Sequence, residues 1–60
     1  MPYDFAGEAK RHREMAEECR TMGELFSDEG MRIQYRKLAE AYAELAENED
    51  RVAANLKIFN

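Results

Sequence analysis

Residues 35–53 read YRKLAEAYAELAENEDRVA, in which one seven-residue unit is written three times. Each unit opens on a larger residue, has an apolar residue three positions later and a small residue four positions later. The opening residues are Tyr35, Tyr42 and Glu49, and the small ones are Ala39, Ala46 and Ala53. This spacing places the repeated residues on one side of an α-helix. A strict seven-residue repeat indicates shallow, left-handed packing against another helix.

A weaker copy of the repeat occupies the first half of the chain. Its larger residues include Phe5, His12, Cys19 and Phe26, and its small residues are Ala9, Ala16 and Gly23. Small side chains let two helix axes approach at the close end of a range of about 8–10 Å. We therefore expect Gly23 to pack against the second helix, although glycine within a helix costs about 1 kcal/mol relative to alanine. A helix that ends early at Gly23 is the competing interpretation.

The chain has one internal break, at Ser27-Asp28-Glu29-Gly30. Asp28 or Ser27 is suited to cap a following helix, and Asp4 is suited to cap the first. We predict a single domain over residues 1–60, with a helix over about 4–26, a turn at 27–28 and a helix over about 29–57. So short a turn makes the helices antiparallel. The predicted register places Phe26 near Met31, Cys19 near Leu38, His12 near Leu45 and Phe5 near Val52.

The composition indicates an all-α protein. Ala, Glu, Arg, Leu and Met supply more than half of the 60 residues, and β-branched residues are scarce. A chain this short needs a disulfide, a metal or a partner chain to fold stably. The single Cys19 cannot form an intrachain disulfide. We therefore predict that the hairpin forms a homodimer, as a four-helix bundle.

The larger apolar side chains form a stripe too wide for the seam of one hairpin, which is typical of an interface. We assign to this interface Phe5, Met15, Cys19, Met22, Phe26, Met31, Tyr35, Leu38, Tyr42, Leu45, Val52, Leu56 and Phe59. The expected partner is a second copy of the chain. An adaptor that uses the same stripe to bind another helical protein is an alternative.

The sequence also suggests where the protein works. The N-terminus has no apolar segment typical of a signal peptide, and no run approaches the roughly 20 apolar residues of a membrane span. A lone cysteine fits a reducing compartment. We expect a cytoplasmic protein that does not associate with membranes.

No residue pattern indicates catalysis. The sequence has no Ser/His/Asp set and no glycine-rich phosphate loop. His12 and Cys19 lie seven residues apart, but this spacing matches no zinc signature. We expect neither catalytic residues nor a metal or cofactor, and we interpret His12 and Cys19 as packing residues.

A basic cluster on the first helix supports an alternative function. It comprises Lys10, Arg11, Arg13 and Arg20, and a small RNA- or DNA-binding regulator could use it. An RNA-binding plasmid copy-number regulator is built as a bundle of this type, which is an analogy of fold alone. The net charge of −4 argues against non-specific DNA binding. We expect the basic run 10–13 to lie opposite Glu44 and Glu47, and the main prediction is a non-enzymatic interaction or regulatory module.

The motifs also resemble a known group of sequences. AEECR at residues 16–20, SD at 27–28 and the tyrosine, leucine and alanine spacing of 35–46 resemble short proteobacterial hypothetical proteins. The resemblance covers about residues 9–47 and implies a helical hairpin with no catalytic role. Glu29 departs from the pattern, because the group often has proline there.

Overall fold

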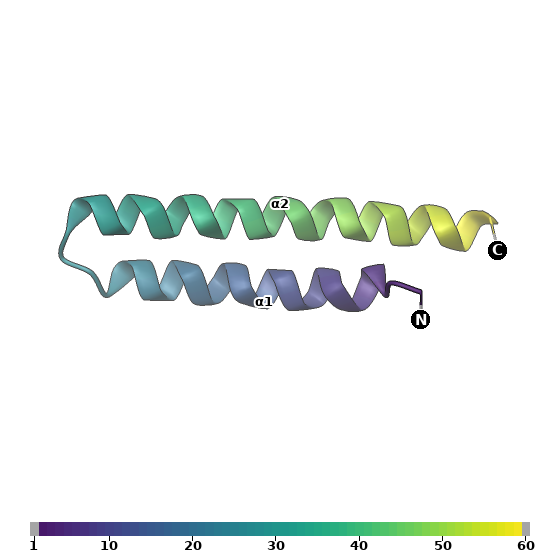
Figure 1. Cartoon of the computed structure of the whole chain (residues 1–60), viewed down its shortest axis with the longest axis horizontal. Coiled ribbons are helices and arrows are strands. Elements are labelled where there is room, and N and C mark those ends of the chain that lie inside the picture. Colours follow the sequence, from purple (N-terminus) through teal and green to yellow (C-terminus); the bar gives the residue numbers. More distant parts are fainter. Residues whose placement is uncertain (1, 60) are drawn as a thin grey trace.

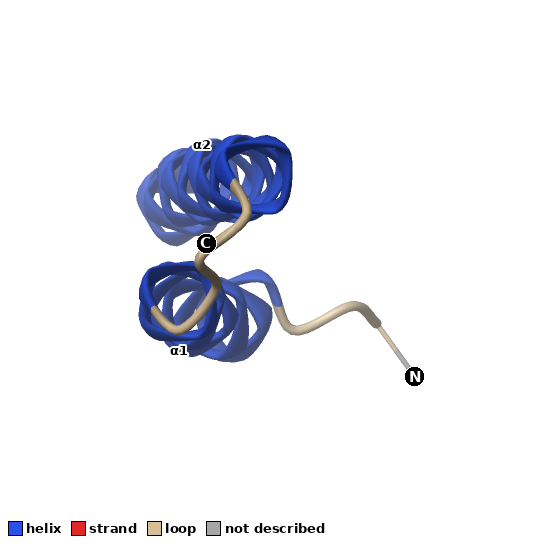
Figure 2. Cartoon of the chain, turned by 90° about the vertical axis from the view of Figure 1, so that its left-hand side faces the viewer, coloured by secondary structure: helices blue, strands red, loops and turns tan. Residues whose placement is uncertain are grey.

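The computed structural model describes the backbone of residues 2–59 and the side chains as far as Lys57. Helix α1 spans Phe5–Glu24 and helix α2 spans Glu29–Phe59. The two helices run antiparallel and side by side (Figure 1), and the end-on view shows a single layer of two helices (Figure 2). The prediction of an all-helical chain with two packed helices is confirmed.

Both helices begin at an aspartate cap. The Asp4 carboxylate accepts a hydrogen bond from the Gly7 amide at 3.1 Å, and the Asp28 carboxylate accepts one from the Met31 amide at 2.8 Å. Each bond satisfies an amide that the first turn of a helix leaves without a partner. The structure thus confirms Asp4 as a cap and selects Asp28 over Ser27.

Helix α1 ends at Glu24, two residues earlier than predicted. The Leu25 amide donates to the carbonyl of Met22 at 3.1 Å, and the Phe26 amide donates to that of Gly23 at 3.3 Å. These tighter bonds close the last turn, because the chain must cross to α2 before the Asp28 cap. Leu25 is left in the connecting loop with 77% of its surface exposed.

The seam between the helices consists of small residues. Its fully buried members are Ala9, Ala16 and Gly23 of α1, and Ala39 and Ala46 of α2. A Cβ atom added to Gly23 would lie 3.0 Å from the Cβ of Tyr35, so glycine allows a close approach there. Gly23 therefore packs against α2 as predicted. Helix α1 nevertheless ends at Glu24, the residue that follows Gly23. Among the described side chains, no large one is completely buried.

The predicted register agrees with the contacts at both ends of the hairpin. Phe5 and Val52 line the same hollow, as expected. Near the turn, Gly23 lies against Tyr35, one residue from the predicted alignment. Phe26 also contacts the ring of Tyr35, at a centroid distance of 5.1 Å.

The small seam can be tested by enlarging one buried alanine. We expect Ala46→Leu to lower the free energy of unfolding by about 1–3 kcal/mol, because the extra atoms force the helices apart. Ala41→Leu, on an exposed position of the same helix, serves as the matched control. Urea unfolding at one protein concentration measures both, and equal stability of the two variants would contradict the close seam.

Candidate protein-interaction face

One flank of the hairpin carries its larger apolar side chains, and we call this the apolar face. On α2 it follows the positions Met31, Tyr35, Leu38, Tyr42, Leu45, Glu49, Val52 and Leu56, and on α1 it includes Phe5, His12, Met15, Cys19, Met22 and Phe26. Contacts between the helices show that both rows lie on the same flank. Phe5 lines a hollow with Leu45 and Val52, and His12 stacks on Tyr42 at a centroid distance of 5.8 Å.

The apolar face is half exposed in the single chain. Leu38, Leu45 and Leu56 keep 44%, 42% and 48% of their surface exposed, and Met22 keeps 45%. Phe5, Met15, Cys19, Phe26, Tyr35 and Tyr42 are half-buried, and Phe59 lies outside the described side chains. The residues that the sequence assigned to an interface therefore flank the small seam without being enclosed by it.

A polar cluster interrupts the apolar face at its open end. Glu49 is only 5% exposed. Its carboxylate accepts a hydrogen bond from the Tyr3 hydroxyl and lies 2.7 Å from Nδ1 of His12, which donates when that nitrogen carries a proton. Every buried side-chain nitrogen or oxygen in the described residues has a partner. The cluster therefore joins the N-terminal segment, α1 and α2 without leaving an unsatisfied polar group.

The Tyr3–Glu49 contact shifts both groups. Burial disfavours the charged form of Glu49, but the hydrogen bonds from Tyr3 and His12 and the charge of His12 outweigh it, so the pKa lies below its ordinary 4.5. The hydrogen bond to Glu49, with lesser contributions from burial and from the charges of Glu49 and Glu8, raises the pKa of Tyr3 to about 12. The cluster is thus a neutral phenol held against an ionised carboxylate.

The opposite flank of the hairpin is charged. Arg13 pairs with Asp50 across the two helices. Glu47 and Asp50 line a groove on this flank together with Arg13. The basic run therefore meets acidic residues as expected: Arg13 shares the groove with Glu47 and pairs with Asp50, and His12 contacts Glu49 on the other flank.

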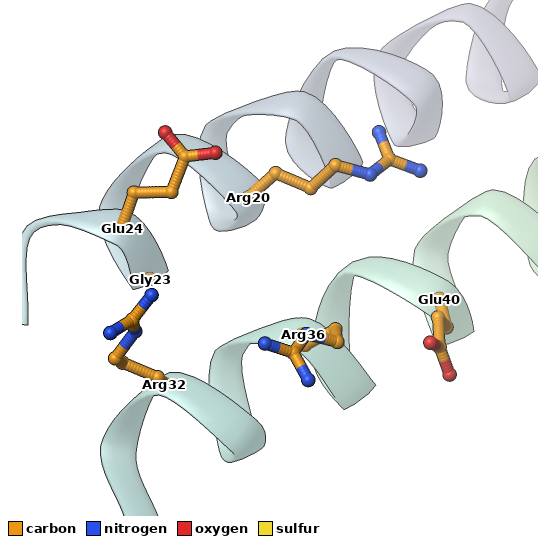
Figure 3. Close-up of a pocket in the computed structure, with 6 residues that line it drawn as sticks. All are labelled: Arg20, Gly23, Glu24, Arg32, Arg36 and Glu40. Carbon is orange, nitrogen blue, oxygen red and sulfur yellow. The ribbon is translucent and has the colours of Figure 1, made fainter. Parts of the chain in front are cut away.

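A second groove on the charged flank lies near the turn, between Arg20 and Glu24 of α1 and three residues of α2 (Figure 3). The α2 residues are Arg32, Arg36 and Glu40. Arg32 reaches toward Gly23, at the C-terminal end of α1. Helix α1 has no basic residue in its own last turn. A positive charge in this place is favourable for a helix C-terminus.

The basic cluster proposed for nucleic acid is largely engaged with carboxylates. Arg11 lies 3.9 Å from Glu8, and Arg20 pairs with Glu17. Arg13 pairs with Asp50, whereas Lys10 is exposed. The structure places these cations on α1 as expected, but intersperses them with acidic groups.

His12 and Cys19 do not converge on a third ligand. Within residues 2–57, no three His, Cys, Asp or Glu side chains form a group that could hold a metal ion. His12 is instead engaged with Glu49 and Tyr42. Across the described part of the chain, neither helix has the length and apolar character that a membrane crossing requires.

Comparison with protein-family models, with curated proteins and with solved structures finds no match to this chain. The geometry of the apolar face therefore carries the functional argument. Sequence reasoning missed the pairing of Tyr3 with Glu49. The signal was present, because Glu49 stands where the two preceding repeats have tyrosine.

The Glu49 cluster makes stability depend on acid. Because the pKa of Glu49 is lower in the folded chain, its contribution is present above pH 4.5 and is lost as the pH falls through the folded-state pKa. We expect Glu49→Gln to be less stable than the wild type at neutral pH, with a difference that shrinks on acidification. Urea unfolding over a pH series measures it, and pH profiles that stay parallel would contradict the assignment.

Tyr3 gives the corresponding dependence at alkaline pH. Since its pKa is raised, its contribution is complete below pH 10 and is lost as the pH rises toward about 12. We expect Tyr3→Phe to remove this loss while keeping the ring that contacts Phe5 edge-on at 4.6 Å. Urea unfolding of the wild type and of Tyr3→Phe over an alkaline pH series measures this difference. If the free energy of unfolding depends on pH in the same way in both proteins, the contact is refuted.

Proposed function

We propose that this chain is a non-enzymatic interaction or regulatory module that acts by self-association. Two hairpins pack their apolar faces together and form a four-helix bundle. The observation that carries the proposal is the row of half-exposed apolar side chains along one flank of both helices, interrupted only at the cluster of Tyr3, His12 and Glu49.

The surface area supports a partner of the size of a second copy. A compact monomer of 7.0 kDa exposes about 4,000 Å², whereas this chain exposes 4872 Å². The excess of roughly 900 Å² is close to the about 800 Å² that each partner buries in an interface of standard size. The radius of gyration is 14.2 Å, whereas a compact chain of this length has about 10 Å. Both the larger radius and the larger surface follow from the elongated shape of the hairpin.

The composition of the seam also supports self-association. Its buried side chains are alanines, which bury little apolar area each. The leucines, methionines and aromatic residues that stabilise a helical bundle lie beside the seam, where a second layer of helices would cover them. The charged flank faces away from that layer and keeps the assembly soluble.

A leucine at the centre of the apolar face tests the proposal. We expect Leu45→Ala to weaken the dimer by about 2–5 kcal/mol per protomer, because association covers the 42% of the leucine surface that the single chain leaves exposed. Sedimentation equilibrium measures the dissociation constant, and the melting temperature should rise with protein concentration in the wild type.

Ile33→Ala is the matched control. Ile33 is 38% exposed on the same helix, close to the 42% of Leu45. It lies five residues from Leu38, which is about 140° around the helix and off the apolar face. We expect this variant to dimerise normally. A wild-type chain that stays monomeric at all concentrations would contradict self-association and leave the apolar face to a different protein.

A further inference from the structure

We propose that the two hairpins pack antiparallel, with a two-fold axis that crosses the middle of α2 at right angles to the helices. This arrangement rests on the proposed self-association. Each α2 then lies along the α2 of the partner, and each turn lies at the open end of the other hairpin.

The apolar positions of α2 are arranged symmetrically about its midpoint. They alternate in steps of four and three residues from Met31 to Leu56, and the centre of this row falls between Ala43 and Glu44. Helix α2 itself spans Glu29–Phe59, whose centre is Glu44. A perpendicular two-fold axis at this point therefore exchanges each apolar position with another one.

The resulting layers match across α2. Met31 meets the partner's Leu56, Tyr35 meets the partner's Val52, and Tyr42 meets the partner's Leu45. Leu38 lies over the partner's Glu49, where it completes the enclosure of a carboxylate that is already 5% exposed. Met31 and Leu56, the exposed residues at the two ends of the face, cover each other in this arrangement.

The same axis also pairs the two copies of α1. Phe5 lies beside Val52, and Gly23 lies beside Tyr35. The axis exchanges Val52 with Tyr35, so it brings Phe5 to the part of the partner's α1 that contains Gly23. The exposed side chain there is that of the neighbouring Met22, which therefore faces Phe5. The hollow lined by Phe5, Leu45 and Val52 then receives an exposed methionine from the other chain.

A parallel arrangement leaves part of the face uncovered. A two-fold axis along the helices would place each α2 over the partner's α1, which begins only at Phe5. Helix α2 continues seven residues beyond Val52, which is about 10 Å, and this overhang is visible in Figure 1. Leu56, which is 48% exposed, would have no residue of α1 above it.

Charge at the ends of α2 favours the antiparallel arrangement as well. Its first turn carries Glu29 and its last turn carries Lys57. Antiparallel packing places Lys57 of each chain at the end of the bundle that holds the partner's Glu29, and brings opposite ends of the helix dipoles together. Parallel packing would bring the two Lys57 side chains to the same end of the bundle.

Disulfide trapping distinguishes the two arrangements. In a Cys19→Ser background, the full chain carrying both Met31→Cys and Leu56→Cys should form a covalent dimer on mild oxidation, seen on a non-reducing gel. The two positions cannot join within one chain, because 25 residues of helix separate them by about 37 Å and a disulfide needs Cα atoms within about 7 Å. Each single variant alone should stay uncrosslinked, and a mixture of the two should crosslink.

Three results would overturn the arrangement. Crosslinking of Leu56→Cys alone would contradict antiparallel packing, because it requires the two copies of residue 56 to lie at the same end of the assembly. Dimers by sedimentation with no crosslink in the double variant would also exclude antiparallel packing. A reduced double variant and a wild-type chain that both sediment as monomers would instead refute the proposed self-association itself. Circular dichroism of each variant confirms that its helices are intact.

Discussion

The close approach of the two helices is the constraint on which the structure depends. Alanine and glycine at every seventh position let the backbones come together, and the contact of Gly23 with Tyr35 shows how little space remains. A seam this narrow has no room for leucine, methionine or phenylalanine. These side chains are displaced to one flank, so tight packing within the hairpin creates the exposed apolar face.

The Glu49 cluster gives that face a distinct end. A carboxylate in place of the expected tyrosine would be costly next to leucines unless it were paired. Tyr3 and His12 satisfy it, and in doing so they hold the N-terminal segment and both helices in one register. Buried polar groups in helical bundles are best known for selecting one register among several of similar energy. The cluster suits that role here, because alanine seams alone distinguish poorly between neighbouring registers.

The sequence predicts the helices and their caps well because these depend on local chemistry. Each cap joins residues three positions apart, Asp4 with Gly7 and Asp28 with Met31, and the repeat joins residues seven positions apart. The structure confirms both caps and both helices. The end of α1 was predicted two residues late, since it depends on how the chain crosses to α2. The Tyr3–Glu49 contact joins residues 46 positions apart and lies outside any local pattern. In the basic cluster, the pairs of Arg11 with Glu8 and of Arg20 with Glu17 are three residues apart and readable from the sequence, whereas the pair of Arg13 with Asp50 depends on the packing of the two helices.

The two flanks of the hairpin divide its possible contacts. On the charged flank, Arg13 pairs with Asp50 across the two helices, and Arg32 is directed to the end of α1. The apolar face stays half exposed in the single chain, so it is the flank that a partner would cover. If two copies associate through it as proposed, a different protein that bound this face would have to displace one of them. The affinity of self-association would then set the affinity that any competing partner must exceed.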